Sequence, residues 1–535
     1  EQIPIRPNTD TALMLALAYI LIKNNTYDKK FIVKYTVGFD SFSEYVLGNK
    51  NNQECSPEWA SKITNIPVKK IYELADQIIS KKTMISLSWS LQRASSGEQP
   101  LWMGITLAAM LGHIGTASGG FGFGYSSVNS TGDSFNRMPW QSLPQGKNKI
   151  RDFIPVARVT DMLENPGGEF DYDGKKLTYP DIKLIYWAGG NPFHHHQDLN
   201  RLVKAWQKPN TIIVNEIWWN SQARHADIIF PANTALERND LMLNPRDPTL
   251  IANKKAMESF HNSKTDYEIF SGLAKELGFL EAFTENKDEL DWIKFIWDSS
   301  SKAHQRKDVS FPKFEDFWEK GFFELPKPET EKVMLNDFRK DPNKFPLNTP
   351  SGKIEISSAT IANFELTDCF SHPYWFEPYE WLGNANKYPL HLISNQPKHR
   401  LHGQLDNAPG SLDSKINGKE PVMINSLDAS NRDIKNGDIV MLYNARGKVL
   451  AGANISDNVM PGVVVLSTGA WFDPDYDLEL EKHGNPNVLT KDVGTSSLSQ
   501  GPTCHTTLVE LRKANKKEIS EVSIFKSPEM LSKRS

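Results

Sequence analysis

Cysteine is scarce in this sequence. The 535 residues contain three cysteines, Cys55, Cys369 and Cys504, which lie far apart and include no CxxC pair. A zinc ribbon or a cysteine-bound iron–sulfur cluster needs closely spaced cysteines, and a disulfide framework needs an even set of them. The sequence therefore excludes these three kinds of structure, and its cysteines give no information about the compartment.

Long hydrophobic runs are absent as well. The most apolar window, Thr11–Ile22, has twelve residues and is too short to cross a bilayer. Its length fits the core of a signal peptide, but no basic segment precedes it and no small-residue cleavage site follows it. Asp10 can cap a helix at this point, so we expect a buried helix and no membrane span.

The chain has no large excess of charge of one sign. Its 61 lysines and arginines and 65 acids leave a net charge of −4, so we expect no nucleic-acid partner. Hydrophobic residues make up 39% and charged residues 24% of the chain, which is typical of globular proteins. The length is enough for about two to four domains.

One stretch, residues 183–240, has the pattern of a nucleotide-binding crossover. Two short apolar runs, Lys183–Ala188 and Thr211–Val214, flank a helical pattern that Asp198 can cap, and a third run ends at Pro231. Strand, turn, helix and strand in this order build a parallel sheet. Such sheets bind ligands at the carboxyl ends of their strands, and polar residues gather there in this sequence.

The residues after the first two strands suit a nucleotide. Gly189 and Gly190 lack a Cβ, so the backbone can approach a phosphate closely. Glu216 follows the second strand, where a carboxylate can accept hydrogen bonds from a ribose or from the edge of a guanine. The loop is not GxGxxG, so the usual nicotinamide fingerprint is missing. A packing turn without a ligand remains the alternative.

Three successive histidines, His194, His195 and His196, raise the question of a metal. Three neighbours in sequence cannot all face one ion from a regular strand or helix. No further cysteine or histidine lies at a known metal spacing from them. We therefore expect a loop that faces a ligand and no metal site.

The pattern of the sequence changes along the chain. Residues 1–80 have helical periodicity, and residues 81–384 alternate strands and helices. Within this second part Gly112–Tyr125 is rich in glycine, so we expect no regular structure there. Residues 385–512 contain short β-rich runs between turn signals, which predicts a separate barrel-like domain. Residues 513–535 are rich in lysine and serine, which indicates a mobile tail.

Five longer segments occur in order along most of the chain. They are SWSLQRASSGEQPLWM (88–103), GGNPFHHHQDLNRL (189–202), HADIIFPANTALERND (225–240), SNQPKHRLHGQLDN (394–407) and NVLTKDVGTSSLSQGPT (487–503). With these segments, the chain resembles the molybdopterin-guanine-dinucleotide oxidoreductases of the dimethyl sulfoxide reductase family. Within that family it is most similar to the branch of trimethylamine-N-oxide, dimethyl sulfoxide and biotin sulfoxide reductases.

The resemblance implies an α/β fold with Rossmann-like parallel-sheet domains, followed by a C-terminal β-barrel domain of the double-psi type. It implies bis(molybdopterin guanine dinucleotide) with molybdenum as the cofactor. The expected reaction is the reduction of a small-molecule S-oxide or N-oxide by oxygen-atom transfer, as in anaerobic respiration. The electrons would come from an external donor such as a cytochrome or a reductase.

The resemblance also assigns cofactor contacts. Around the crossover these would be Gly189, Gly190, Asn191, His195, Gln197, Asp198, Glu216, Ser221, Arg224 and Asp227. In the terminal domain they would be Asn395, Gln396, Lys398, Arg400, His402, Gln404, Asn487, Asp492, Thr495, Ser496 and Gln500. Amide and imidazole groups suit the edges of a pterin, and arginine and lysine suit phosphates. For any single one of these residues, an ordinary polar position on the surface is the alternative.

Trp89 and Arg93 lie in the segment that lines the substrate funnel in this branch, and the resemblance implies that they are catalytic residues. Arg93 can hold the oxide oxygen by a charge-assisted hydrogen bond, or it can form a structural ion pair. The family commonly has HGEQ after this arginine, whereas this chain has Ser95-Ser96-Gly97-Glu98. This departure weakens any inference about the substrate.

No residue of this chain can be matched to the serine that holds molybdenum in this branch. The match begins inside the family's second domain, so residues 1–80 would be the helical part of a truncated α/β domain, and we expect the chain to be inactive by itself. The alternatives are a non-catalytic or split-enzyme subunit that needs a partner chain, and an unrelated nucleotide-binding enzyme, which the family segments disfavour. The signal for location would precede this chain, and the periplasm is favoured over the cytoplasm.

Overall fold

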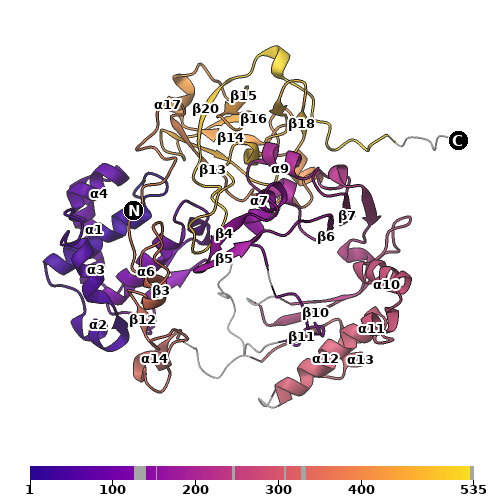
Figure 1. Ribbon diagram of the computed structural model, residues 1–535, viewed down its shortest axis with the longest axis horizontal. Helices are drawn as coiled ribbons and strands as arrows, with labels where there is room; N and C mark the ends of the chain where they lie inside the picture. The colour runs from indigo at the N-terminus through magenta and orange to yellow at the C-terminus, as the bar shows by residue number, and fades with distance from the viewer. Residues whose placement is uncertain (126–139, 152, 244–246, 306–308, 327–332, 530–535) are drawn as a thin grey trace.

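The computed structural model describes residues 1–125, 140–151, 153–243, 247–305, 309–326 and 333–529. In Figure 1 the N-terminal helices lie on the left, a barrel formed by the C-terminal part of the chain lies at the top, and the crossover lies beneath the barrel. Helices and a small sheet from the middle of the chain lie at the lower right.

Helices dominate the N-terminal part. They are α1 (Asp10–Lys23), α2 (Lys29–Tyr35), α3 (Phe39–Val46), α4 (Pro57–Thr64) and α5 (Val68–Ser80). The predicted buried helix is present as α1, but Asp10 is its first residue and Thr9 is its N-cap, so the expectation that Asp10 caps the helix is wrong. Among the described residues, no helix combines the length and the apolar content that crossing a membrane requires.

A two-stranded parallel sheet follows these helices. α6 (Glu98–Met110) connects β2 (Met84–Leu87) to β3 (Gly120–Phe123). The expectation that the glycine-rich stretch has no regular structure is therefore wrong for β3. Glycine fits this strand because a Cβ at Gly122 would lie 2.3 Å from the ring of Tyr125.

The crossover forms the parallel unit that the sequence predicts. β6 (Leu184–Ala188), β7 (Thr211–Glu216) and β8 (Ile228–Pro231) pair in parallel in this order. Two helices, α8 (Pro192–His195) and α9 (Leu199–Ala205), connect β6 to β7. The side chain of Asp198 caps α9 by accepting a hydrogen bond from the N–H of Arg201, as expected.

In the described part of the chain, six strands close into a barrel. They are β13 (Leu390–Ile393), β14 (Pro421–Ile424), β15 (Ile439–Tyr443), β16 (Lys448–Ile455), β17 (Val463–Leu466) and β20 (Leu508–Lys513). Their order is β14-β17-β13-β20-β15-β16, and β16 pairs back to β14 to close the ring. The pairs β13–β17 and β14–β16 are parallel. The predicted fold class, parallel α/β sheets followed by a C-terminal β-barrel, is confirmed.

The middle of the chain adds an antiparallel unit that the sequence pattern does not reveal. β9 (Asp240–Met242), β10 (Thr249–Asn253) and β11 (Phe322–Glu324) form its sheet. The helices α10 (Asp266–Glu276), α12 (Glu289–Gln305) and α13 (Phe314–Lys320) belong to the same unit, where the rings of Trp297 and Phe317 stack at 3.8 Å.

Shorter elements complete the chain. The helices are α7 (Val159–Glu164), α11 (Leu280–Thr284), α14 (Asn336–Lys340), α15 (Ala359–Ala362), α16 (Pro409–Leu412) and α17 (Ser426–Ser430). The strands are β1 (Thr36–Val37), β4 (Glu169–Tyr172), β5 (Lys175–Thr178), β12 (Ile354–Glu355), β18 (Pro474–Asp475) and β19 (Leu480–Glu481). β1 and β12 pair in parallel and join the N-terminal helices to the segment that leads into the barrel.

The barrel and the crossover share one hydrophobic core. Phe193, Leu202 and Trp206 of the crossover belong to the same buried cluster as Leu392 and Val464 of the barrel. The composition change near residue 385 therefore marks a change of architecture, while the two parts remain packed against each other.

The end of the chain packs against the barrel as far as the structure describes it. The N–H groups of Ser523 and Ile524 donate to Oδ2 of Asp473, and Ile524 is buried. The ring of Phe525 lies 5.5 Å from that of Trp471. These contacts differ from the mobile tail that the composition indicates, and residues 530–535 lie outside the described part.

The shared core predicts a large stability effect at Leu202, which is fully buried. Leu202→Ala should lower the free energy of unfolding by about 2–5 kcal/mol, because it leaves a cavity between α9 and the barrel. Urea unfolding measures this difference. Leu277→Ala is the control, since this leucine is 70% exposed and its truncation should cost less than about 0.5 kcal/mol. Equal losses for the two variants would contradict a shared core.

Candidate functional site

A cavity of about 1370 Å³ lies between the crossover and the barrel. Its lining comes from the segments that follow the carboxyl ends of β2, β3, β6, β7, β8, β13 and β17, together with residues just before β20. Ordinary small-molecule sites occupy about 300–1,000 Å³, so this cavity can hold a large ligand. Its position at the ends of parallel strands is the one that the sequence predicts.

Most of the expected contact residues line this cavity. They are Trp89, Arg93, Gly189, Gly190, Asn191, His195, Gln197, Glu216, Asn395, Gln396, His402, Gln404 and Asn487. They come from opposite walls, the crossover and the barrel, and from the loop after β2. The structure thus brings together residues that lie up to about 400 positions apart in the sequence.

The crossover wall presents bare backbone to the cavity. Gly189 and Gly190 have φ angles of +78° and +74°, a region that side chains disfavour. Apart from the neighbours of Gly189 in the chain, no heavy atom of the described residues would lie within 4 Å of a Cβ at this position, so this face of the glycine is open. Glu216 is the last residue of β7 rather than a residue after it, since the strand extends two residues beyond its predicted end at Val214. Glu216 lies beside these glycines, and burial raises the pKa of its carboxyl. Open backbone next to an acid suits a phosphate and a hydrogen-bond donor on one ligand.

The three successive histidines face different neighbours. The ring of His194 stacks on that of Trp471 with 6.0 Å between centroids. Nε2 of His196 lies 2.7 Å from Oγ1 of Thr160 and 3.2 Å from Asp492. Burial lowers the pKa of His194 to about 3 and that of His195 to about 4, so both are neutral at pH 7. Within the described residues, no three His, Cys, Asp or Glu side chains form a group that could hold a metal.

The barrel wall contributes amide and imidazole groups. Nε2 of Gln396 lies 3.0 Å from Nδ1 of His402, and Oε1 of Gln396 accepts from the N–H of His402. His402 has a φ angle of +51°, which is uncommon for a residue with a side chain. Oδ1 of Asn395 accepts from Oγ of Ser467 at 2.9 Å. These contacts orient neutral donors and acceptors at the cavity surface.

Arg93 brings a positive charge to a part of the cavity lined by neutral groups. Its carbonyl accepts from the N–H of His505, and among the described residues its guanidinium forms no ion pair. Burial, and to a lesser extent the charge of Arg93, lower the pKa of His402. Burial also lowers the pKa of His505 to about 4 and raises that of Cys504 to about 11. The predicted alternative of a structural ion pair for Arg93 therefore has no support in this part of the chain.

The other predicted contacts lie outside the cavity lining. They are Asp198, Ser221, Arg224, Asp227, Lys398, Arg400, Asp492, Thr495, Ser496 and Gln500. Several of them hold the backbone in place. Oγ of Ser221 donates to the carbonyl of Phe472, Oδ2 of Asp227 accepts from the N–H of Ile212, and Nε2 of Gln500 donates to the carbonyl of Asp171. Arg224 donates to carbonyls near the C-terminus, including that of Ile524. Lys398 is exposed.

Arg400 and Asp492 form buried ion pairs. The side chain of Arg400 is 1% exposed and contacts Asp406 at 3.4 Å and Glu420 at 3.2 Å. The side chain of Asp492 is also 1% exposed and contacts Arg158 at 3.2 Å. The sequence did not reveal these charged partners within the protein. Because both side chains are buried in ion pairs, neither faces a ligand in the cavity.

Sequence reasoning missed other residues that line the cavity. They include Tyr125, Asn215, Trp218, Asn233, Arg238, Asp266, Thr468, Trp471, Cys504 and His505. Several of them follow a strand that was predicted, so the rule about carboxyl ends could have found them. Tyr125 follows β3, a strand that the glycine-rich sequence did not predict. His505 carries a further signal, because its buried Nδ1 has no hydrogen-bond partner in the part of the chain that the structure describes.

Comparisons with known proteins agree with this geometry. Residues 1–276 match the family model described as molybdopterin oxidoreductase, and residues 390–508 match the one described as molybdopterin dinucleotide binding domain. The chain is 45% identical to a biotin sulfoxide reductase of Cereibacter sphaeroides over 95% of its length and 68% of the relative's. It is 42% identical to a dimethyl sulfoxide/trimethylamine N-oxide reductase of the same organism over 98% and 66% of the two chains.

A further relative has a similar identity and coverage. A trimethylamine-N-oxide reductase of Haemophilus influenzae is 42% identical and covers 99% of this chain, which spans 67% of that relative. The chain thus spans about two thirds of the length of the curated relatives it matches. Among solved structures, acetylene hydratase from Pelobacter acetylenicus has the same fold, with a TM-score of 0.66 and 15% identity over 95% of this chain and 71% of the other.

The neutral buried histidines beside the cavity predict a pH dependence of stability. His391 of β13 is fully buried with Nε2 2.8 Å from the carbonyl oxygen of His505, and burial lowers its pKa to about 4. The unfolded chain binds a proton at this residue below about pH 6.5, whereas the folded chain does so only below about pH 4. His391 therefore lowers the free energy of unfolding as the pH falls through this window, by about 2 kcal/mol at pH 5.

His391→Gln keeps an N–H donor but does not titrate. Between pH 7 and pH 5 the variant should lose about 2 kcal/mol less unfolding free energy than the parent protein, as measured by urea unfolding at both pH values. His399→Gln is the control, because it is the same substitution at an exposed histidine. A pH dependence unchanged in His391→Gln would show that His391 is not held neutral by the fold.

Proposed function

Because the chain belongs to the molybdopterin oxidoreductase family, we propose that it takes part in the reduction of S-oxides or N-oxides by oxygen-atom transfer and binds the cofactor in the cavity between the crossover and the barrel. Family membership confirms the resemblance noted in the sequence, the molybdenum oxidoreductase class and the bis(molybdopterin guanine dinucleotide) cofactor. The substrates, electron donor and activity of the longer relatives are proposals for this chain.

The observation that carries the proposal is the chemistry of the two cavity walls. A dinucleotide with a pterin at one end needs close backbone for its phosphates, an acceptor for its guanine and neutral amides for its pterin edge. Gly189 and Gly190 leave open space on one wall, Glu216 lies on the same wall, and Gln396 and His402 lie on the other. The residues present therefore fit the cofactor that the family binds.

Each residue has a binding or orienting task in this proposal. When bound, the cofactor supplies the two-electron redox chemistry. The backbone at Gly189 would receive a phosphate, and Glu216 would accept hydrogen bonds from the guanine. Arg93 would hold the oxygen of the oxide by a charge-assisted hydrogen bond, and the exposed ring of Trp89 would bound the substrate's path. The overall reaction takes up two electrons and two protons and releases water, and an external cytochrome or reductase would supply the electrons.

The proposal predicts what the purified protein contains. Protein made in a molybdenum-replete host should carry molybdenum and release GMP on denaturation. Gly189→Ala should lower the GMP recovered by about tenfold, because the added methyl projects into the open face where a phosphate would lie. Gly278→Ala is a matched control with φ at +81° and open space around its Cβ, outside the cavity lining. Equal losses in both variants would indicate general strain and count against a phosphate at Gly189.

The sequence further predicts that this chain does not turn over by itself, since none of its residues has been assigned as the protein ligand of molybdenum. The test is a reductase assay of the isolated chain with reduced viologen dye and dimethyl sulfoxide or trimethylamine N-oxide. We expect no rate above that of buffer. Measurable turnover would refute the predicted inactivity and support the proposed reaction, whereas molybdenum and GMP without turnover would agree with both proposals.

A further inference from the structure

A short loop carries several barrel residues into the cavity. Leu401, His402, Gly403, Gln404 and Leu405 all line it. His402 and Leu405 have φ angles of +51° and +55°, which residues with a side chain rarely adopt. Such a conformation persists only where the surrounding structure determines it, and it is found often where a protein grips a ligand. The contacts that hold this loop are therefore of functional interest.

The loop lies in a narrow space. A Cβ at Gly403 would lie 2.1 Å from Nδ1 of His194, so the crossover is in direct contact with the loop on one side. A Cβ at Gly469 would lie 2.1 Å from the carbonyl oxygen of His402, so the turn after β17 closes the other side. A side chain at either glycine would overlap these neighbours, so the loop is packed closely on both sides.

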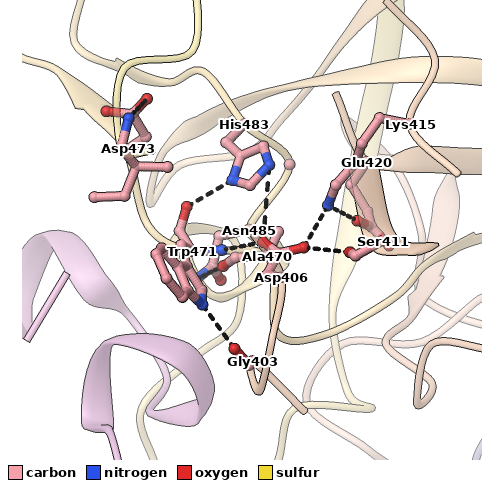
Figure 2. A network of polar contacts seen from close by, with 12 residues as sticks. Gly403, Asp406, Ser411, Lys415, Glu420, Ala470, Trp471, Asp473, His483 and Asn485 are labelled. Atoms are coloured by element: carbon pink, nitrogen blue, oxygen red, sulfur yellow. Dashed lines mark hydrogen bonds and ion pairs between the residues drawn. The ribbon is translucent and has the colours of Figure 1, made fainter. Parts of the chain in front are cut away.

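Trp471 ties the loop to a buried acid. Its indole Nε1 donates to the carbonyl of Gly403 at 2.7 Å, and its ring lies nearly parallel to that of His194, at 10°. The backbone N–H of Trp471 donates to Oδ2 of Asp406 at 3.0 Å, as Figure 2 shows. Asp406 follows directly after the loop, so one side chain connects the end of the loop to the tryptophan that holds its centre.

The other oxygen of Asp406 is held by a buried, charge-balanced group. Oδ1 accepts from Oγ of Ser411 at 2.7 Å and from Nζ of Lys415 at 2.8 Å, and Nε of Arg400 lies 3.4 Å away. Glu420 completes the group through Lys415 at 2.6 Å and Arg400 at 3.2 Å. Burial opposes ionisation of Asp406, but the nearby positive charges hold its pKa below the usual range. The four charged side chains are each at most 4% exposed.

His483 supports the same tryptophan from behind. Its Nδ1 donates to the carbonyl of Trp471 at 2.9 Å, and burial lowers its pKa to about 3, so the ring is neutral. Figure 2 shows the imidazole above Trp471 and Asp406. The backbone N–H and the carbonyl of Trp471 therefore both have fixed partners, and the indole has little freedom to move away from Gly403.

We propose that Asp406 is a positioning residue for the cavity, which acts through Trp471 and the carbonyl of Gly403 to hold the Leu401–Leu405 loop where His402 and Gln404 face the ligand. This inference rests on the proposed function for the nature of the ligand. The geometry of the loop itself does not depend on it. Asp406 touches neither ligand nor cofactor, so its effect must pass through the loop.

Two double variants separate positioning from simple loss of charge. Asp406→Leu with Lys415→Met removes one acid and one base and leaves the N–H of Trp471 without its acceptor. Glu420→Met with Lys415→Met removes one acid and one base as well, but keeps Asp406 and its contact to Trp471. Both pairs preserve the net charge of the group and use residues of similar shape. Trp471→Phe removes the indole donor to Gly403 and part of the ring that stacks on His194, and it keeps the backbone N–H and carbonyl of residue 471.

Two measurements on the full chain test the positioning role of Asp406. Hydrogen–deuterium exchange reports the loop, and the GMP released on denaturation of protein made in a molybdenum-replete host reports the cofactor bound in the cavity. We expect faster exchange over residues 401–405 and about tenfold less GMP for Asp406→Leu/Lys415→Met and for Trp471→Phe, and neither effect for Glu420→Met/Lys415→Met. Restoring an oxygen at this position with Asp406→Asn/Lys415→Met should recover most of the binding.

The outcomes distinguish this inference from the proposed function. Equal behaviour of the Asp406 and Glu420 double variants in both measurements would overturn it, since stability alone would then account for the effects. If the parent chain releases no GMP but loop exchange responds to the substitutions as expected, this would support the positioning role of Asp406 and count against the proposed ligand. If an Asp406 variant fails to fold, Trp471→Phe still decides the matter, because unchanged loop exchange and an unchanged GMP content in that variant would overturn the inference.

Discussion

The pairing of buried charge is the constraint on which the cavity depends. A carboxylate taken out of water costs on the order of several kcal/mol unless cations or N–H groups surround it. The barrel buries Glu481 beside the group around Asp406, and burial raises the pKa of Glu481 to about 7 although four backbone N–H groups donate to it. These donors are Asp473, His483, Gly484 and Asn485, at 2.7–3.1 Å. The groups that hydrogen-bond to these buried acids or pair with them come from different turns. These contacts therefore fix the turns relative to one another.

The same turns carry the residues that face the cavity. Asn485 donates one side-chain N–H bond to the carbonyl of Ala470 and another to that of Phe193, at 2.9 and 3.0 Å. Asn487 donates to the carbonyl of His194 at 3.2 Å. The turn that Glu481 closes therefore reaches α8 of the crossover, and the two walls of the cavity are joined by buried amides as well as by the shared hydrophobic core.

The sequence predicts those features of this architecture that local patterns encode. The crossover was predictable because β6, α9 and β7 each have their own apolar periodicity. Gly189 and Gly190 follow the end of β6, and Glu216 ends β7. β3 was not predictable, since its two glycines make close contacts that only the fold reveals, Gly120 with the backbone of Ile114 and Gly122 with the ring of Tyr125.

Arg400 and Asp492 show a second limit of the sequence. Arginine suits a phosphate as well as a buried carboxylate, and only the fold shows that Arg400 meets Asp406 and Glu420. The partner of Asp492, Arg158, lies 334 positions away, so no local pattern could reveal it. The family resemblance predicted the residue types of the site, while the structure was required to separate the residues that line the cavity from those in internal ion pairs.

The charge of the cavity sets how a large anionic ligand can be held. His195, His402 and His505 line it, and burial lowers the pKa of each, so a moderate fall in pH adds little positive charge. Arg238 also lines the cavity but is paired with Asp240 at 3.2 Å. Among the described lining residues, Arg93 is therefore the cation without an ion-pair partner. Its single positive charge is too small to neutralise the diphosphates of two dinucleotides. Neutral backbone and amide donors must then supply much of the binding, and such contacts are weak unless they are held in place before the ligand arrives. A strained loop held by paired buried charges meets that requirement.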